Sequence, residues 1–126
     1  MGRLDNKVAI ITGGAASIGK AITSRLHADG ARVVIAARSE DKGEALAAQL
    51  GERALYVKTD ITQDDDLRHL VARTVEHFGA LHILVNNACV YGDDGAETPR
   101  ETWLATLNTN AVSAAILGEM AIEHLA

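Results

Sequence analysis

The fold of this chain is decided by residues 8–20, which read Val-Ala-Ile-Ile-Thr-Gly-Gly-Ala-Ala-Ser-Ile-Gly-Lys. A run of mostly β-branched and apolar residues is followed by a glycine-rich turn, and an amphipathic helix begins beyond it. This order places the free backbone N–H groups of a helix N-terminus, and the positive end of its dipole, next to the turn. The stretch is therefore typical of a turn that binds a phosphate group, although glycine also serves simply to allow a tight strand-to-helix connection.

Outward from this stretch, short apolar runs alternate with helical patterns along the chain. A helix is predicted after each run, the first three of them ending at a glycine, and Thr62 is the expected N-cap of the third. The last helix is expected to begin at Pro99 and to break near residues 108–110. The apolar runs themselves predict strands over residues 7–11, 32–37, 54–58 and 81–85.

Strand–helix alternation at this spacing predicts an α/β fold, a Rossmann-like doubly wound parallel sheet with helices packed on it. Right-handed crossovers give the expected strand order 3-2-1-4, which puts the glycine turn at the switch point of the sheet. Ligands of such sheets bind beyond the carboxyl ends of the strands. Residues that directly follow the predicted strands are therefore the candidates for a binding site.

Length and composition narrow the class of protein. The chain has 126 residues, a formal net charge of −5 and one cysteine, Cys89. We expect a single domain over residues 1–126 that binds neither nucleic acid nor an anionic membrane, because its charge would repel both. The lone cysteine and an N-terminus without a long apolar run lead us to expect a cytoplasmic protein. No spacing of His, Cys or acidic residues predicts a metal site.

Two nucleotide-binding patterns come close to the glycine turn. The dinucleotide fingerprint Gly-x-Gly-x-x-Gly is not matched, because three residues separate Gly13 from Ser17. Residues 14–20 match the phosphate-loop spacing Gly-x4-Gly-Lys, but Ala21 stands where a Ser or Thr would hold magnesium. The turn alone leaves both a dinucleotide and a nucleoside triphosphate open.

Polar residues at the other strand ends separate these alternatives. Asp60-Ile61-Thr62 follows the third predicted strand, Asn86-Asn87-Ala88 the fourth, and Asn108-Thr109-Asn110-Ala111 lies in the last helical region. With Thr12-Gly13 and Gly19, in this order and at this spacing, the chain from Lys7 to about Asn110 resembles the short-chain dehydrogenase/reductase family. The resemblance implies an oxidoreductase that interconverts an alcohol and a carbonyl of a small-molecule substrate by hydride transfer with NADP or NAD.

The resemblance assigns the glycine turn to the cofactor. Gly13 and Gly19 would form the turn under the pyrophosphate, and Ile18 would line the nicotinamide side. Ser17 stands where family members usually carry glycine. Either its hydroxyl bonds the phosphate, or its Cβ displaces the turn and weakens binding.

The same resemblance gives roles to residues at the other strand ends. Asp60, with Ile61 beside it, would accept a hydrogen bond from the adenine amino group, as a carboxylate can. Asn87 and Ala88 would flank the adenosine ribose, and the Cys89 side chain would pack beside the cofactor. Asn110 corresponds to the active-site Asn of the family, which breaks the helix and helps to hold a water in a proton relay.

Cofactor choice is predicted from the end of the second strand. Enzymes that prefer NAD usually carry an acidic residue there, which binds the ribose 2′-hydroxyl. This chain has Ala37, followed by Arg38 and Ser39. Because a guanidinium suits a 2′-phosphate, NADP is the expected cofactor, unless Arg38 is an ordinary solvated charge.

The resemblance also implies groups that residues 1–126 do not supply. Family members carry a Ser on the next strand, then a Tyr and a Lys four residues after it, and neither Tyr56 nor Tyr91 has that spacing. The chain is therefore expected to be an incomplete, cofactor-binding half that lacks the C-terminal strands and is inactive by itself. A catalytically inactive nucleotide-binding or assembly module is the alternative. Expected partners are a completing C-terminal half, on the open edge of the fourth strand, or further copies on the small-residue stretch 111–125.

Overall fold

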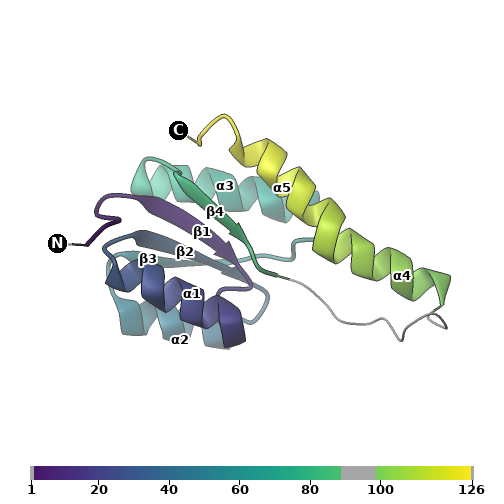
Figure 1. The fold of residues 1–126 in the computed structure, drawn as a ribbon, viewed down its shortest axis with the longest axis horizontal. Coiled ribbons are helices and arrows are strands. Elements are labelled where there is room, and N and C mark those ends of the chain that lie inside the picture. Colours follow the sequence, from purple (N-terminus) through teal and green to yellow (C-terminus); the bar gives the residue numbers. More distant parts are fainter. Residues whose placement is uncertain (1, 89–98, 126) are drawn as a thin grey trace.

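The computed structural model describes residues 2–88 and 99–125. Strands and helices alternate in the predicted way, and α4, η1 and α5 follow one another as one helical rod (Figure 1). In chain order the elements are β1 (Val8–Thr12), α1 (Ser17–Ala28), β2 (Arg32–Ala37), α2 (Glu40–Leu50), β3 (Ala54–Lys58), α3 (Asp64–Phe78), β4 (Ile83–Asn86), α4 (Arg100–Leu107), the π-helix η1 (Asn108–Val112) and α5 (Ser113–Ala121).

The four strands form one parallel sheet in the order β3-β2-β1-β4, which confirms the predicted topology. Every residue of β1 is buried, because this strand has a neighbour on each side. In the register, Ile10 lies between Val34 of β2 and Leu84 of β4. Within the described residues β4 pairs with β1 alone, so its other edge is open.

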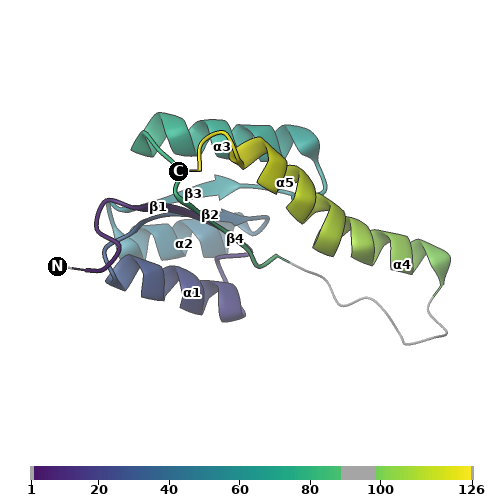
Figure 2. The same ribbon diagram turned by 45° about the horizontal axis from the view of Figure 1, so that its top comes forward.

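Helices cover both faces of the sheet. Helices α1 and α2 lie on one face, and α3 and α5 lie on the other (Figures 1 and 2). Alternate β1 residues serve the two layers: Ala9 and Ile11 pack in the cluster on the α1 side, and Ile10 packs on the α3 side. Both layers are apolar, as expected for a parallel sheet that is buried on both faces.

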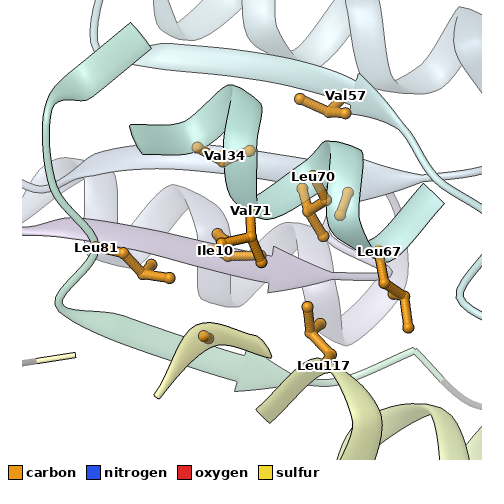
Figure 3. Packing of buried hydrophobic residues seen from close by; sticks show 10 residues of the cluster. Ile10, Val34, Val57, Leu67, Leu70, Val71, Leu81 and Leu117 are labelled. Carbon is orange, nitrogen blue, oxygen red and sulfur yellow. The ribbon is translucent and has the colours of Figure 1, made fainter. Parts of the chain in front are cut away.

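The larger core cluster joins α3 and α5 to the sheet. Leu70 and Val71 of α3 and Leu117 of α5 lie over Ile10 of β1 in Figure 3, and Val34 lies beside them. Leu70 and Leu117 are almost fully buried. A buried leucine side chain contributes roughly 1.5–3 kcal/mol relative to an exposed one, so this cluster fixes α3 and α5 on the sheet.

Several predicted boundaries are corrected by one or two residues. The first strand is Val8–Thr12 rather than residues 7–11, and the fourth is Ile83–Asn86 rather than residues 81–85. Thr62 is not the N-cap of α3: Gln63 holds that position, because the Thr62 hydroxyl donates to the Asp60 carboxylate instead. Pro99 is the N-cap residue of α4 rather than its first helical residue.

The predicted break in the last helical region is confirmed as a π-helix, η1. At its C-terminal end, the Ser113 hydroxyl donates to the Asn108 carbonyl oxygen at 2.8 Å, across five residues. A side-chain hydroxyl can bond a carbonyl oxygen of its own helix in addition to, or in place of, a backbone N–H. Such bonds accompany local widening of a helix. Asn110 lies within this π-helix.

Candidate nucleotide-binding site

A cavity of about 480 Å³ lies at the carboxyl ends of β1, β2, β3 and β4. Parallel strands all point their carboxyl ends to one side of the sheet, so segments far apart in the sequence meet there. Every residue predicted to bind the cofactor lines this cavity. They are Gly13, Ser17, Ile18, Gly19, Arg38, Ser39, Asp60, Ile61, Asn87 and Ala88.

The glycine turn forms one wall of the cavity, and its close contacts explain its composition. Gly13 has φ of +66°, and a Cβ there would lie 3.0 Å from the Ala88 Cα atom. A Cβ on Gly19 would overlap the Gly13 carbonyl group, whose oxygen accepts a hydrogen bond from the Asn87 side-chain amide. Helix α1 is held against the turn by the Thr23 hydroxyl, which donates to the Gly14 oxygen at 3.1 Å.

Ser17 begins α1 in a left-handed backbone conformation, with φ of +52°. Such a conformation costs an L-residue roughly 1–2 kcal/mol and costs glycine nothing. The Ser17 side chain is exposed and lines the cavity, and the neighbouring Ile18 is 70% exposed. An exposed isoleucine at the mouth of a cavity offers apolar contact to a flat ring.

Thr12 is a site residue whose role sequence analysis missed. Its hydroxyl oxygen accepts hydrogen bonds from the backbone N–H groups of Asn87 and Ala88, both at 3.0 Å. The same hydroxyl donates to the Val85 carbonyl oxygen at 3.3 Å. Thr12 therefore holds the segment after β4 against the end of β1. Its place in the Thr12-Gly13 motif and at the end of a buried strand drew attention to the position, but neither indicates these hydrogen bonds.

Asp60 is oriented by two neighbours. Its Oδ1 atom accepts hydrogen bonds from the Thr62 hydroxyl at 2.6 Å and the Thr62 backbone N–H at 3.0 Å. Its own N–H donates to the Asp66 carboxylate at 2.8 Å. The Thr62 hydroxyl and backbone N–H, and then the nearby charge of Arg38, lower the pKa of Asp60 below its ordinary value, although burial opposes them. Asp60 is thus a fixed, ionised acceptor at the cavity wall.

The end of β2 brings a cation to the cavity and no acid. Ala37 occupies the last position of the strand, and the exposed Arg38 and Ser39 follow it. Arg38 lies close enough to Asp60 for its charge to lower the pKa of that carboxyl group. Ser39 is at the N-cap of α2, but its side chain forms no capping hydrogen bond.

Other residues around the cavity were not predicted or lie elsewhere. Thr109 of the π-helix lines the cavity, whereas its neighbour Asn110 is half-buried and is absent from the lining. Lys42 of α2 also lines it and was not singled out from the sequence. The expected place of Cys89 lies outside the described residues.

Two further properties concern the described part of the chain. Across residues 2–88 and 99–125, no three His, Cys, Asp or Glu side chains gather as a group that could hold a metal ion. None of the described helices is both long and apolar enough to cross a bilayer.

The comparisons with known proteins identify the class. The sequence model of the short chain dehydrogenase family matches residues 7–126, so the chain belongs to that family. Tropinone reductase-like 1 of Erythroxylum coca is 46% identical over 93 residues, which are 74% of this chain and 34% of that protein. The putative ketoacyl reductase 2 of the granaticin polyketide synthase of Streptomyces violaceoruber is 42% identical over 125 residues, 94% of this chain and 49% of that protein.

A solved structure supports the same family. A short-chain dehydrogenase/reductase of Brucella melitensis, described as a glucose/ribitol dehydrogenase, superposes with a TM-score of 0.92 at 31% identity. The match covers 98% of this chain and 54% of that one. The chain thus spans about half the length, or less, of the relatives that it matches.

Proposed function

We propose that the protein is an NADP-dependent oxidoreductase that interconverts an alcohol and a carbonyl, and that residues 1–126 supply its cofactor-binding half. One observation carries this proposal: the glycine turn, Arg38, Asp60 and Asn87 line a single cavity at the switch point of a short-chain dehydrogenase sheet. The cavity fits the cofactor because the close contacts of Gly13 and Gly19 let the turn fold tightly, and neither residue puts a side chain at the cavity wall. The nicotinamide ring, when bound, donates or accepts the hydride.

Each wall of the cavity has a part in binding. The glycine turn and the start of α1 receive the pyrophosphate on backbone N–H groups, and Ile18 contacts the nicotinamide side. Asp60 accepts a hydrogen bond from the adenine amino group on the carboxylate oxygen that Thr62 leaves free. Asn87 and Ala88, held by Thr12, lie against the ribose.

Asn110 is proposed to help hold a water for proton transfer, as the family resemblance implies. Its place in the π-helix supports this role, because a widened turn changes the direction in which backbone and side-chain groups point. The proton donor itself, a Tyr with its Ser and Lys, is expected in the part of the protein that relatives carry beyond this stretch. The isolated 126-residue chain is therefore expected to bind the cofactor without turning it over.

The preference for NADP rests on the end of β2. A carboxylate at Ala37 would repel a 2′-phosphate, and this chain has none there. Arg38 lines the cavity near Asp60, which would receive the adenine, and its planar guanidinium suits a phosphate.

Fluorescence titration with NADPH and NADH tests the proposal. The wild-type protein should bind NADPH more tightly than NADH. Arg38→Ala should lower the affinity for NADPH about tenfold or more, because an exposed charge–phosphate contact contributes roughly 1–2 kcal/mol. The affinity for NADH should stay within about twofold of the wild-type value. Equal losses for both cofactors would remove the assignment of Arg38, and a folded protein that binds neither would refute the proposed function.

A further inference from the structure

A second hollow adjoins the cofactor cavity, between the N-terminal part of α1 and one side of α2 along most of its length. Its volume is about 360 Å³, and it shares Ala15, Ala16, Ser17 and Lys42 with the larger cavity. The remaining lining residues are Lys20 of α1 and Ala45, Leu46 and Gln49 of α2. The floor is small and apolar, and its charged groups are the two lysines, one from each helix.

Helical spacing explains why α2 presents a lysine to this groove and keeps its acids away. Lys42 lies three residues before Ala45 and four before Leu46, and Gln49 lies four and three residues after these two, so all four share one side of the helix. Gly43 lies on another side, against the ring of Tyr56, which would clash with any Cβ there.

Two of the three acidic residues of α2, Glu40 and Glu44, belong to this Tyr56 side. Burial, and then the negative charges of Glu40 and Glu44, raise the pKa of Tyr56, which places both acids near its hydroxyl. Neither acid lines the groove or the cofactor cavity.

Lys42 is placed to act together with Arg38. Both side chains are exposed and line the larger cavity, and neither forms an ion pair with any described residue. Two cations that line one cavity repel each other and are both stabilised by an anion bound between them. If Asp60 and Asn87 hold an adenosine, a phosphate on its ribose would supply this anion next to Arg38 and Lys42.

We propose that Lys42 is a specificity-determining residue, which binds the 2′-phosphate of NADP together with Arg38 where the cavity meets the groove. This inference rests on the proposed function, since it requires an adenosine 2′-phosphate in the cavity. Lys20 lines only the groove and takes no part in this contact. Lys42 supplies a flexible point charge, whereas the Arg38 guanidinium has a fixed planar geometry.

Isothermal titration of the full-length protein with two adenosine fragments tests the inference. Adenosine 2′,5′-bisphosphate carries the 2′-phosphate, and adenosine 5′-monophosphate lacks it. Lys42→Ala should lower the affinity for the bisphosphate about fivefold to tenfold, as expected for one exposed charge-assisted contact. The affinity for the monophosphate should stay within about twofold of the wild-type value. Raising the salt from about 0.02 M to about 0.5 M should shrink the difference.

Matched variants separate this role from a general effect of positive charge. Lys7→Ala, at the far end of β1, and Lys20→Ala should each leave the affinity for both fragments within about twofold. Unchanged bisphosphate binding by Lys42→Ala, or an equal loss for both fragments, would overturn the inference while the proposed function stands. A wild-type protein that binds neither fragment would overturn both.

Discussion

Ser17 holds a backbone conformation that glycine adopts freely, at the position where the chain turns from β1 into α1. Its φ is +52°, and the residue is exposed and lines the cavity. The turn packs tightly around Ser17, because Gly13 and Gly19 lie in close contact and Thr23 bonds Gly14. We therefore expect the Ser17 hydroxyl to contact the phosphate, and displacement of the turn is the alternative that substitution of Ser17 tests.

Ser17→Gly and Ser17→Ala together test this view. Glycine should remove about 1 kcal/mol of strain from the folded state, and its extra chain entropy should stabilise the unfolded state by roughly 0.5 kcal/mol. The free energy of unfolding in urea should therefore rise by about 0.5 kcal/mol. Alanine keeps the strain and should leave stability nearly unchanged. Both variants lose the hydroxyl and should bind NADPH about threefold to tenfold more weakly. A glycine variant less stable than the alanine variant would contradict the strain, and unweakened binding would contradict the phosphate contact.

Asp60 owes its low pKa first to Thr62, and this gives a pH dependence with a definite sign. The folded carboxyl group releases its proton at lower pH than the unfolded one, whose pKa is about 3.9. Its contribution to stability is therefore complete above about pH 4 and is lost as the pH falls through the folded value. Thr62→Val should raise the pKa of Asp60, as followed by NMR titration of its carboxyl carbon. Thr62→Ser keeps the hydroxyl and should leave that pKa near the wild-type value; equal titrations of the two variants would exclude the hydroxyl as the cause.

At the scale of elements, the site depends on how β1 and β4 end side by side. Thr12 lies opposite Asn86 in the register, and its hydroxyl then bonds the two residues that follow. Because the hydroxyl is buried, water cannot replace it when it is removed. The part of the cavity wall formed by Asn87 and Ala88 is thus positioned by two paired strands rather than by a loop alone.

Thr12→Val keeps the shape of the side chain and removes the hydroxyl. Two N–H donors then lose their acceptor, and the free energy of unfolding should fall by about 1–3 kcal/mol in urea titrations. NADPH binding should weaken as well, because Asn87 and Ala88 are no longer held. Thr12→Ser retains the hydroxyl and should bind NADPH like the wild type, with a stability loss of about 1 kcal/mol for the methyl group. If valine and serine variants bound NADPH equally well, the hydroxyl would have no part in shaping the site.

The sequence predicted the elements well and their mutual contacts poorly. Buried strands are visible as apolar runs, and strand ends of a parallel sheet must meet, so the lining from Gly13 to Ala88 could be expected. The hydrogen bonds of Thr12 cross 73 to 76 residues and leave no local pattern. Thr62 illustrates the other limit: the same hydroxyl suits an N-cap or an Asp60 carboxylate, and only the folded geometry decides between them.

At the scale of the whole molecule, apolar surface is concentrated on the rod formed by α4, η1 and α5. Leu117 and Ala121 bury one side of α5 in the core, so part of the small-residue stretch covers the sheet. Helix α4 extends beyond the sheet in both views and buries no residue (Figures 1 and 2). Its Leu104 and Leu107 are 59% and 52% exposed, and Ile122 after α5 is 69% exposed.

Several exposed leucine and isoleucine side chains along one helical rod are typical of a protein–protein interface. We therefore expect the proposed homo-oligomer of the full-length protein to form through α4 and α5, and Leu107→Glu should disrupt it. Glutamate preserves helix propensity but places a charge where an apolar contact is expected. Light scattering coupled to size exclusion should show the mass fall to that of one chain, whereas Ala48→Glu on exposed α2 should leave it unchanged. Since Leu107 does not line the cavity, the monomeric variant should still bind adenosine 2′,5′-bisphosphate within about twofold of the wild type. A Leu107→Glu protein that keeps the wild-type mass would show that this rod is not the oligomer contact.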